Sequence, residues 1–87
     1  MKELKKLFPE LKIYSSGDHV TNPYSGEGCD LNAEELAVYD YVIGLEHMIT
    51  RNGGAFNPAT SKYQREMRKA LDWFRHSNAE AYMILLD

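Results

Sequence analysis

The sequence has little cysteine and proline, and it lacks any long apolar run. Among its 87 residues are one cysteine, Cys29, and three prolines. A single cysteine cannot form an internal disulfide, and the usual zinc-binding spacings need at least a second one. The longest apolar run, residues 81–86, falls far short of the roughly 20 residues that span a bilayer. These absences argue against a disulfide-stabilised fold, a cysteine-based zinc site and a membrane protein.

The composition that remains is that of a small globular domain. Apolar residues make up 44% of the chain and charged residues 26%, which is more apolar than disordered segments are. The chain is too short to divide into two domains, and it has no internal repeat, low-complexity tract or linker rich in Pro or Ser. Residues 1–14 carry charges throughout, unlike a signal peptide. We therefore expect a single domain over residues 1–87, located in the cytoplasm.

Charges of opposite sign are segregated along the chain, although the formal net charge is only −3. Residues 17–46 contain no Lys or Arg. Their acidic residues are Asp18, Glu27, Asp30, Glu34, Glu35, Asp40 and Glu46. Residues 57–76 instead carry five basic side chains against Glu66 and Asp72. The simplest interpretation is that solvated faces of opposite sign lie at opposite ends of the domain. The alternatives are a partner surface for each sign, or head-to-tail association of copies.

The apolar spacing near the N-terminus predicts a short helix. Leu4, Leu7, Phe8 and Leu11 recur at helical spacing. Pro9 lacks a backbone N–H and restricts the residue before it, so the helix must stop or kink there.

The stretch NPYSGEG, residues 22–28, predicts the turn of a β-hairpin. Pro23 presets a turn, and Gly26 or Gly28 tolerates positive φ, which suits a loop of about four to six residues. A phosphate-binding loop is the alternative, but its Walker form requires Lys followed by Ser or Thr after the last glycine. No Lys follows Gly28, and no basic residue of this segment offsets its carboxylates. We therefore interpret the stretch as a turn.

Start and stop signals predict a long helix over about residues 33–51. Asn32 can cap its first turn, and Glu35 can complete a capping box. One apolar face contains Val38, Val42, Leu45 and Ile49, and a second contains Leu36, Tyr39 and Ile43. With two apolar faces, the helix should be central and buried on two sides. Glycine in a helix interior lowers the stability of the helix by roughly 1 kcal/mol relative to Ala. We interpret its presence at position 44 as a sign that a neighbouring backbone approaches Gly44 closely.

A second long helix is predicted from Asn57, as the cap, and Pro58, in the first turn, to about residue 76. Its apolar stripe comprises Tyr63, Met67, Ala70, Leu71 and Phe74, with Trp73 at the edge. Ser77 and Glu80 predict a further capping box before a short C-terminal helix. Residues 81–86 have no polar side, so this helix should be buried in the core or in an interface. The predicted fold is mainly α (α+β), a small single domain with two long helices, short terminal helices and one β-hairpin.

No constellation of residues specifies a reaction, a metal site or a cofactor. The three histidines, His19, His47 and His76, belong to three different predicted elements. Asp40 and His47 lie two helical turns apart, about 10 Å of rise, which is too far for an acid–base pair. Cys29 is flanked by carboxylates, which raise a thiol pKa rather than lower it. We therefore predict a protein that is not an enzyme, with no catalytic residues, no metal ligands and no cofactor.

The basic side of the second long helix is the candidate binding surface. This patch consists of Lys62, Arg65, Arg68, Lys69 and Arg75. Such side chains contact phosphate backbones, and Tyr63 or Trp73 at the margin can stack on a base. A sequence pI of about 5.5 is nevertheless low for a dedicated nucleic-acid binder. A protein partner is favoured, because the same arginines suit acidic protein surfaces and the apolar C-terminal helix offers burial.

Residues 22–46 and 74–87 resemble a group of small, uncharacterised bacteriophage proteins. That group pairs an Asn-Pro-x-Ser/Thr-Gly turn with a helix that contains a Tyr-Asp element and a Gly-x-Glu element. The matching residues here are Asn22, Pro23, Ser25 and Gly26, then Tyr39 and Asp40, then Gly44 and Glu46. The resemblance implies a phage origin and carries over no reaction or ligand.

Together these features predict a non-enzymatic phage accessory or host-interaction protein that acts in the host cytoplasm through a protein-binding surface. A homo-oligomer is compatible with this prediction. One alternative is a nucleic-acid-binding module that uses the basic face of the helix over residues 57–76. Another is a virion structural component.

Overall fold

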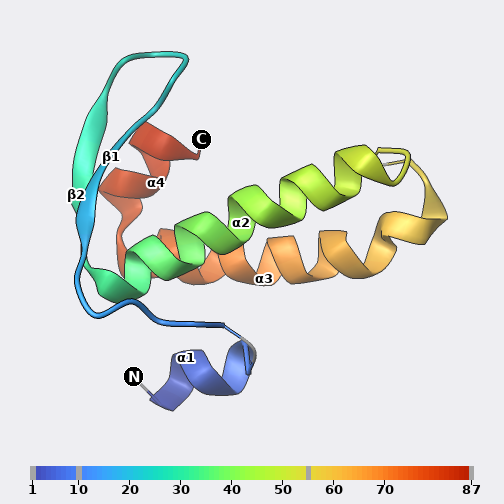
Figure 1. Cartoon of the computed structure of the whole chain (residues 1–87), viewed down its shortest axis with the longest axis horizontal. Helices are drawn as coiled ribbons and strands as arrows, with labels where there is room; N and C mark the ends of the chain where they lie inside the picture. The colour runs from blue at the N-terminus through green and yellow to red at the C-terminus, as the bar shows by residue number, and fades with distance from the viewer. Residues whose placement is uncertain (1, 10, 55, 87) are drawn as a thin grey trace.

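Helices dominate the computed structural model, which describes residues 2–9, 11–54 and 56–86 (Figure 1). In chain order the elements are α1 (Lys2–Leu7), β1 (Asp18–Thr21), β2 (Gly28–Leu31), α2 (Ala33–Arg51), the 3-10 helix η1 (Pro58–Thr60), α3 (Ser61–Ser77) and α4 (Ala79–Leu85). Helices α2 and α3 form an antiparallel pair, and α4 packs against α3 and β2. The predicted fold class is confirmed, with two long helices, short terminal helices and one β-hairpin. Within the described ranges, none of the helices has the length and apolar character needed to cross a bilayer.

Helix α2 has the predicted bounds because both ends are capped by local contacts. The Asn32 side chain accepts a hydrogen bond from the Glu35 N–H at 2.8 Å, and the Glu35 carboxylate accepts one from the Asn32 N–H at 3.0 Å. At the other end, Gly53 and Gly54 have φ values of +104° and +85°, which residues with side chains rarely adopt. The Gly54 N–H donates to the Ile49 carbonyl at 2.8 Å and so closes the last turn.

The prediction that α2 is buried on two sides is correct for one side only. Its buried residues are Ala37, Val38, Val42, Leu45 and Ile49. On the second face, Leu36, Tyr39 and Ile43 are half-buried. Helix α3 packs along α2, whereas Tyr39 and Ile43 of the second face line an open groove beside the hairpin turn and the end of α4. An apolar surface therefore stays partly open to solvent along α2.

The interpretation of Gly44 as a point of close backbone approach is wrong. Gly44 is exposed, and a Cβ at this position would meet no atom within 4 Å apart from the neighbouring backbone of its own helix. The glycine therefore weakens the helix without a packing benefit. We expect Gly44→Ala to raise the free energy of unfolding by about 0.5–1 kcal/mol, because Ala restricts the unfolded chain and favours helix. Urea unfolding monitored by circular dichroism measures this difference, and an unchanged or lowered value would contradict it.

The NPYSGEG stretch forms the turn of the hairpin, as predicted. Strands β1 and β2 pair antiparallel from Asp18 opposite Leu31 to Thr21 opposite Gly28. Within the turn, the Asn22 side chain accepts a hydrogen bond from the Tyr24 N–H at 2.8 Å. The Asn22 amide also donates to the Ile84 carbonyl of α4 at 2.9 Å. The turn therefore ties the hairpin to the C-terminal helix.

The C-terminal helix begins and packs differently from the prediction. Helix α3 extends through Ser77, so the cap of α4 is Asn78, whose side chain accepts a hydrogen bond from the Ala81 N–H at 3.1 Å. Ser77 is therefore not the capping residue. Ala81 and Leu85 are buried, but the side chain of Met83 is 68% exposed. Burial in the core, one of the two predicted alternatives, therefore applies only to the side of α4 that faces β2 and α3.

The N-terminal segment completes the core. Helix α1 ends before Pro9, as predicted, and Leu4, Phe8 and Leu11 are almost fully buried. They join Phe74 of α3 and residues of α2, β2 and α4 in one apolar cluster. The Phe8 ring contacts the Tyr41 ring of α2 edge-on, with centroids 5.5 Å apart.

Candidate functional site

All five residues of the predicted basic patch lie exposed on α3, but two of them have partners within the fold. The Lys69 ammonium lies 3.3 Å from a carboxylate oxygen of Glu66 and donates a hydrogen bond to the Leu7 carbonyl at 3.2 Å. It also lies 5.3 Å from the centre of the Phe8 ring. Lys69 therefore fastens the N-terminal segment to α3. Arg75 is paired with Asp72 at 3.2 Å.

Three cations remain available on this surface. Lys62, Arg65 and Arg68 have no ion pair with any other described residue. We call these three residues the basic face. It is smaller than the predicted patch, because Glu66 and Asp72 of the same helix pair with Lys69 and Arg75.

A groove between α2 and α3 adjoins the basic face. Its volume is about 400 Å³. The residues that line this helix groove are Glu46, Ile49, Thr50, Gly54, Gln64, Met67, Arg68 and Leu71. Ile49, Met67 and Leu71 supply apolar surface, and Arg68 belongs to both the groove and the basic face. The two features therefore form one continuous surface of charged and apolar character.

A second groove lies between the hairpin turn, α2 and the C-terminal end of α4. At about 640 Å³ it is larger than the helix groove. The residues that line this hairpin groove are Asn22, Pro23, Tyr24, Tyr39, Asp40, Ile43, Glu46, His47, Thr50, Leu85 and Leu86. Glu46 and Thr50 line both grooves, so a single stripe of α2 separates them.

The hairpin groove is acidic and aromatic. Asp40 and Glu46 are its charged residues, and none of the described residues that line it is Lys or Arg. The Tyr14 hydroxyl donates a 2.6 Å hydrogen bond to Asp40. This bond, together with the negative charge of Asp40, raises the pKa of Tyr14. Burial, followed by the charge of Asp40, raises the pKa of Tyr39. Both hydroxyls therefore stay protonated at neutral pH, and the two carboxylates define the charge of the groove.

Sequence reasoning did not find the hairpin groove, although two signals pointed toward it. One was the absence of Lys and Arg from residues 17–46, which we attributed to solvation. The other was the second apolar face of α2, which we expected to be buried. The structure also brings together the two motif segments of the phage resemblance, since Asn22, Pro23, Tyr39, Asp40 and Glu46 all line this groove.

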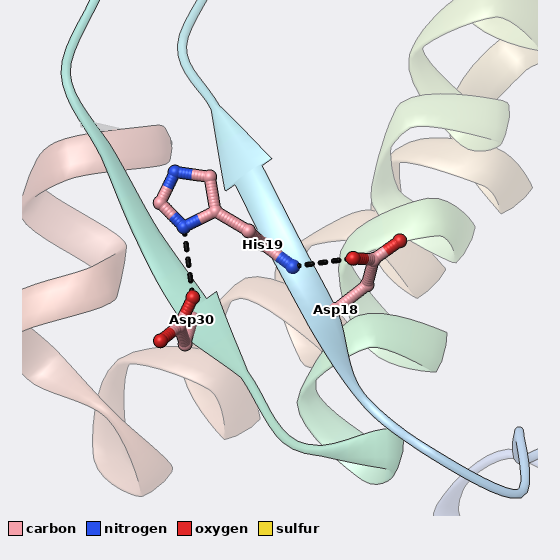
Figure 2. Close-up of polar contacts among 3 residues, drawn as sticks. All are labelled: Asp18, His19 and Asp30. Atoms are coloured by element: carbon pink, nitrogen blue, oxygen red, sulfur yellow. Dashed lines mark hydrogen bonds and ion pairs between the residues drawn. The ribbon is translucent and has the colours of Figure 1, made fainter.

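The hairpin also carries an exposed carboxylate–imidazole pair (Figure 2). His19 and Asp30 face each other across the strands, with Nδ1 and Oδ1 2.8 Å apart, and the Asp18 carboxylate accepts a hydrogen bond from the His19 N–H at 2.7 Å. In a catalytic triad, the other ring nitrogen of such a pair activates a hydroxyl or thiol nucleophile. No described hydroxyl or thiol donates to His19 Nε2, and Cys29 points to the opposite face of the sheet because it neighbours Asp30 in the strand. The pair serves as a cross-strand contact.

Cys29 and the two remaining histidines lie on three different elements. Burial raises the pKa of the Cys29 thiol, and the negative charges of Glu80, Asp30 and Glu35 raise it further. A thiol in this environment is a poor nucleophile at neutral pH. His47 and His76 lie on different helices, and the described residues contain no cluster of three or more potential metal ligands.

Comparison with known proteins adds no relative. No family model, no curated protein and no solved structure matches this chain. The resemblance to small phage proteins therefore stays a prediction from the quoted motifs.

Proposed function

We propose that this protein is a non-enzymatic interaction protein whose basic face and helix groove bind an acidic protein surface. One observation supports the proposal: the basic face, whose cations have no ion pair among the described residues, adjoins the apolar residues of the helix groove. Arg68 lines the helix groove beside Met67 and Leu71, and Arg65 lies one helical turn away. Protein interfaces combine an apolar centre with a charged rim in this way. The resemblance to phage proteins supports an accessory role toward a host protein in the host cytoplasm.

Nucleic-acid binding through the same face is the second candidate, and the exposed Lys62, Arg65 and Arg68 favour it. Single-stranded nucleic acid is usually held by aromatic side chains on which bases stack. Tyr63 and Trp73, the expected stacking residues, are half-buried, and Trp73 packs against the core. A protein partner therefore fits the described surface better than a nucleic acid does.

A tagged pull-down from host lysate, performed with and without nuclease, tests the proposal. We expect a protein partner that persists after nuclease treatment. Arg65→Glu combined with Arg68→Glu should lower its capture roughly tenfold or more, because reversed charges repel an acidic surface. A matched control, Lys12→Glu with Arg51→Glu, changes the net charge equally at exposed positions outside the basic face and should retain capture.

The other outcomes are equally informative. Loss of all bound material on nuclease treatment would support nucleic-acid binding instead. Equal capture by the charge-reversed variant and the control would exclude the basic face as the binding site.

A further inference from the structure

The hairpin groove contains apolar and aromatic surface that the fold leaves open. The Tyr24 side chain, at the hairpin turn, is 97% exposed. Tyr39 and Ile43 are half-buried on the incompletely covered face of α2, and Leu86 contributes from the end of α4. Aromatic and apolar residues around a concavity are characteristic of surfaces that receive a side chain from a partner. The groove thus has the shape and composition of a docking site.

The charge of the hairpin groove restricts its occupant. Asp40 and Glu46 lie six residues apart on α2, which corresponds to about 9 Å of rise. Tyr14 holds the Asp40 carboxylate through its hydrogen bond, so one side of the carboxylate is fixed and the other remains available. An arginine complements this arrangement well, because its planar guanidinium pairs with carboxylates and also stacks on aromatic rings.

Such arginines are present on α3 of the same chain. Arg65 and Arg68 are exposed, project from one helix and lack an ion pair among the described residues. The hairpin groove and the basic face share no residue. One copy can therefore offer both surfaces at once, each to a different neighbour.

We propose that the hairpin groove of one copy binds the basic face of a second copy, so that the chains associate head to tail. This inference rests on the proposed function, because it names a partner for the same basic face. Since the two surfaces differ, the interface is heterologous, and repetition closes a ring or extends a filament according to the rotation between copies. A host protein with an acidic surface would compete with the neighbouring copy for Arg65 and Arg68.

Analytical ultracentrifugation of the full chain over a concentration series tests this proposal with three variants. The groove variant is Asp40→Lys with Glu46→Lys, and the basic-face variant is Arg65→Gln with Arg68→Gln. The control variant, Asp18→Lys with Glu80→Lys, changes the charge as the groove variant does but at positions outside the groove. All six substituted residues are exposed, so the variants should fold, which circular dichroism verifies.

The wild-type protein and the control variant should show a mass that rises with concentration and falls with added salt. Each of the other two variants should remain monomeric, with association weakened by about tenfold or more. An equimolar mixture of the groove and basic-face variants should form a dimer and no larger species. In that mixture the basic face of the groove variant binds the hairpin groove of the basic-face variant. The substituted groove and the substituted basic face do not bind each other.

A wild-type protein that stays monomeric at every concentration would overturn the inference. So would a mixture of the two variants that forms no dimer, or a basic-face variant that associates like the wild type. These results would leave the proposed function intact if capture of a protein from lysate still required Arg65 and Arg68. Loss of that requirement would remove the proposed function as well.

Discussion

Replacing Gly17 by Ala is expected to lower the free energy of unfolding by about 3 kcal/mol. Gly17 lies just before β1, beside the point where β2 leads into α2. A Cβ at this position would overlap the Leu31 carbonyl oxygen and would stand 2.8 Å from the Asn32 Cα. Both are backbone atoms, so no side-chain rotation relieves the contact. The backbone must move, which disturbs the buried Leu31 and the cap of α2.

Gly44→Ala provides the matched control for this experiment, since it makes the same chemical change where no atom lies within 4 Å. Urea unfolding should place the two variants on opposite sides of the wild type, about 4 kcal/mol apart. A Gly17→Ala variant within about 0.5 kcal/mol of the wild type, the usual range for surface substitutions, would show that the two backbone segments are not in close contact.

The contrast between these glycines shows what could be predicted from sequence. The sequence alone does not distinguish the environments of the two glycines. Gly44, which was predicted to face a neighbouring backbone, faces solvent. The close approach occurs at Gly17 and involves Leu31, fourteen positions further along the chain. Helix α2, by contrast, begins and ends where predicted because Asn32, Glu35 and Gly54 act through contacts within a few residues. Structure that is set by contacts within a few residues could therefore be predicted from the sequence, whereas contacts between distant segments could not.

The same distinction applies to the candidate sites. The basic residues of α3 were correctly expected on a surface, because helical periodicity separates them from Ala70 and Phe74. That Lys69 binds the Leu7 carbonyl was not predictable, since the two residues are 62 positions apart. The hairpin groove was missed for a related reason. Its walls come from three elements, and only their relative placement leaves Tyr39 and Ile43 partly uncovered.

The charges of the hairpin groove and the basic face are consistent with both proposals, the binding of an acidic protein and the head-to-tail association of copies. Asp40 and Glu46 line a groove that lacks Lys and Arg among its described residues, while Arg65 and Arg68 lack acidic partners on their own helix. Arg68 and Glu46 both line the helix groove, but among the described residues no ion pair joins them. An external partner can satisfy either surface at low salt, and ions screen such exposed charges at distances beyond about 10 Å at 0.1 M salt.

Phe8→Ala is expected to lower the free energy of unfolding by about 3–5 kcal/mol. The Phe8 side chain is 2% exposed and lies between α2 and α3, where it contacts the Tyr41 ring and the Lys69 ammonium. Truncation removes the buried ring, the edge-on aromatic contact and the cation–π contact together. The N-terminal segment loses its main attachment to the two long helices. Urea unfolding measures the total loss, and hydrogen exchange locates the region that opens first.

Two control variants separate the contributions of the Phe8 contacts. Phe8→Leu keeps most of the buried volume and should cost about 1.5 kcal/mol or less, whereas Lys69→Met removes only contacts of a largely exposed cation and should cost less than about 1 kcal/mol. Because Leu7 and Phe8 hold Lys69, detachment of this segment in Phe8→Ala leaves the Lys69 ammonium, beside Arg65 and Arg68, with only its exposed pair to Glu66. Capture of an acidic protein partner by Phe8→Ala should then equal or exceed that of the wild type, provided that hydrogen exchange shows α2 and α3 still protected. Reduced capture with α2 and α3 intact would mean that the N-terminal segment itself contributes to the binding surface.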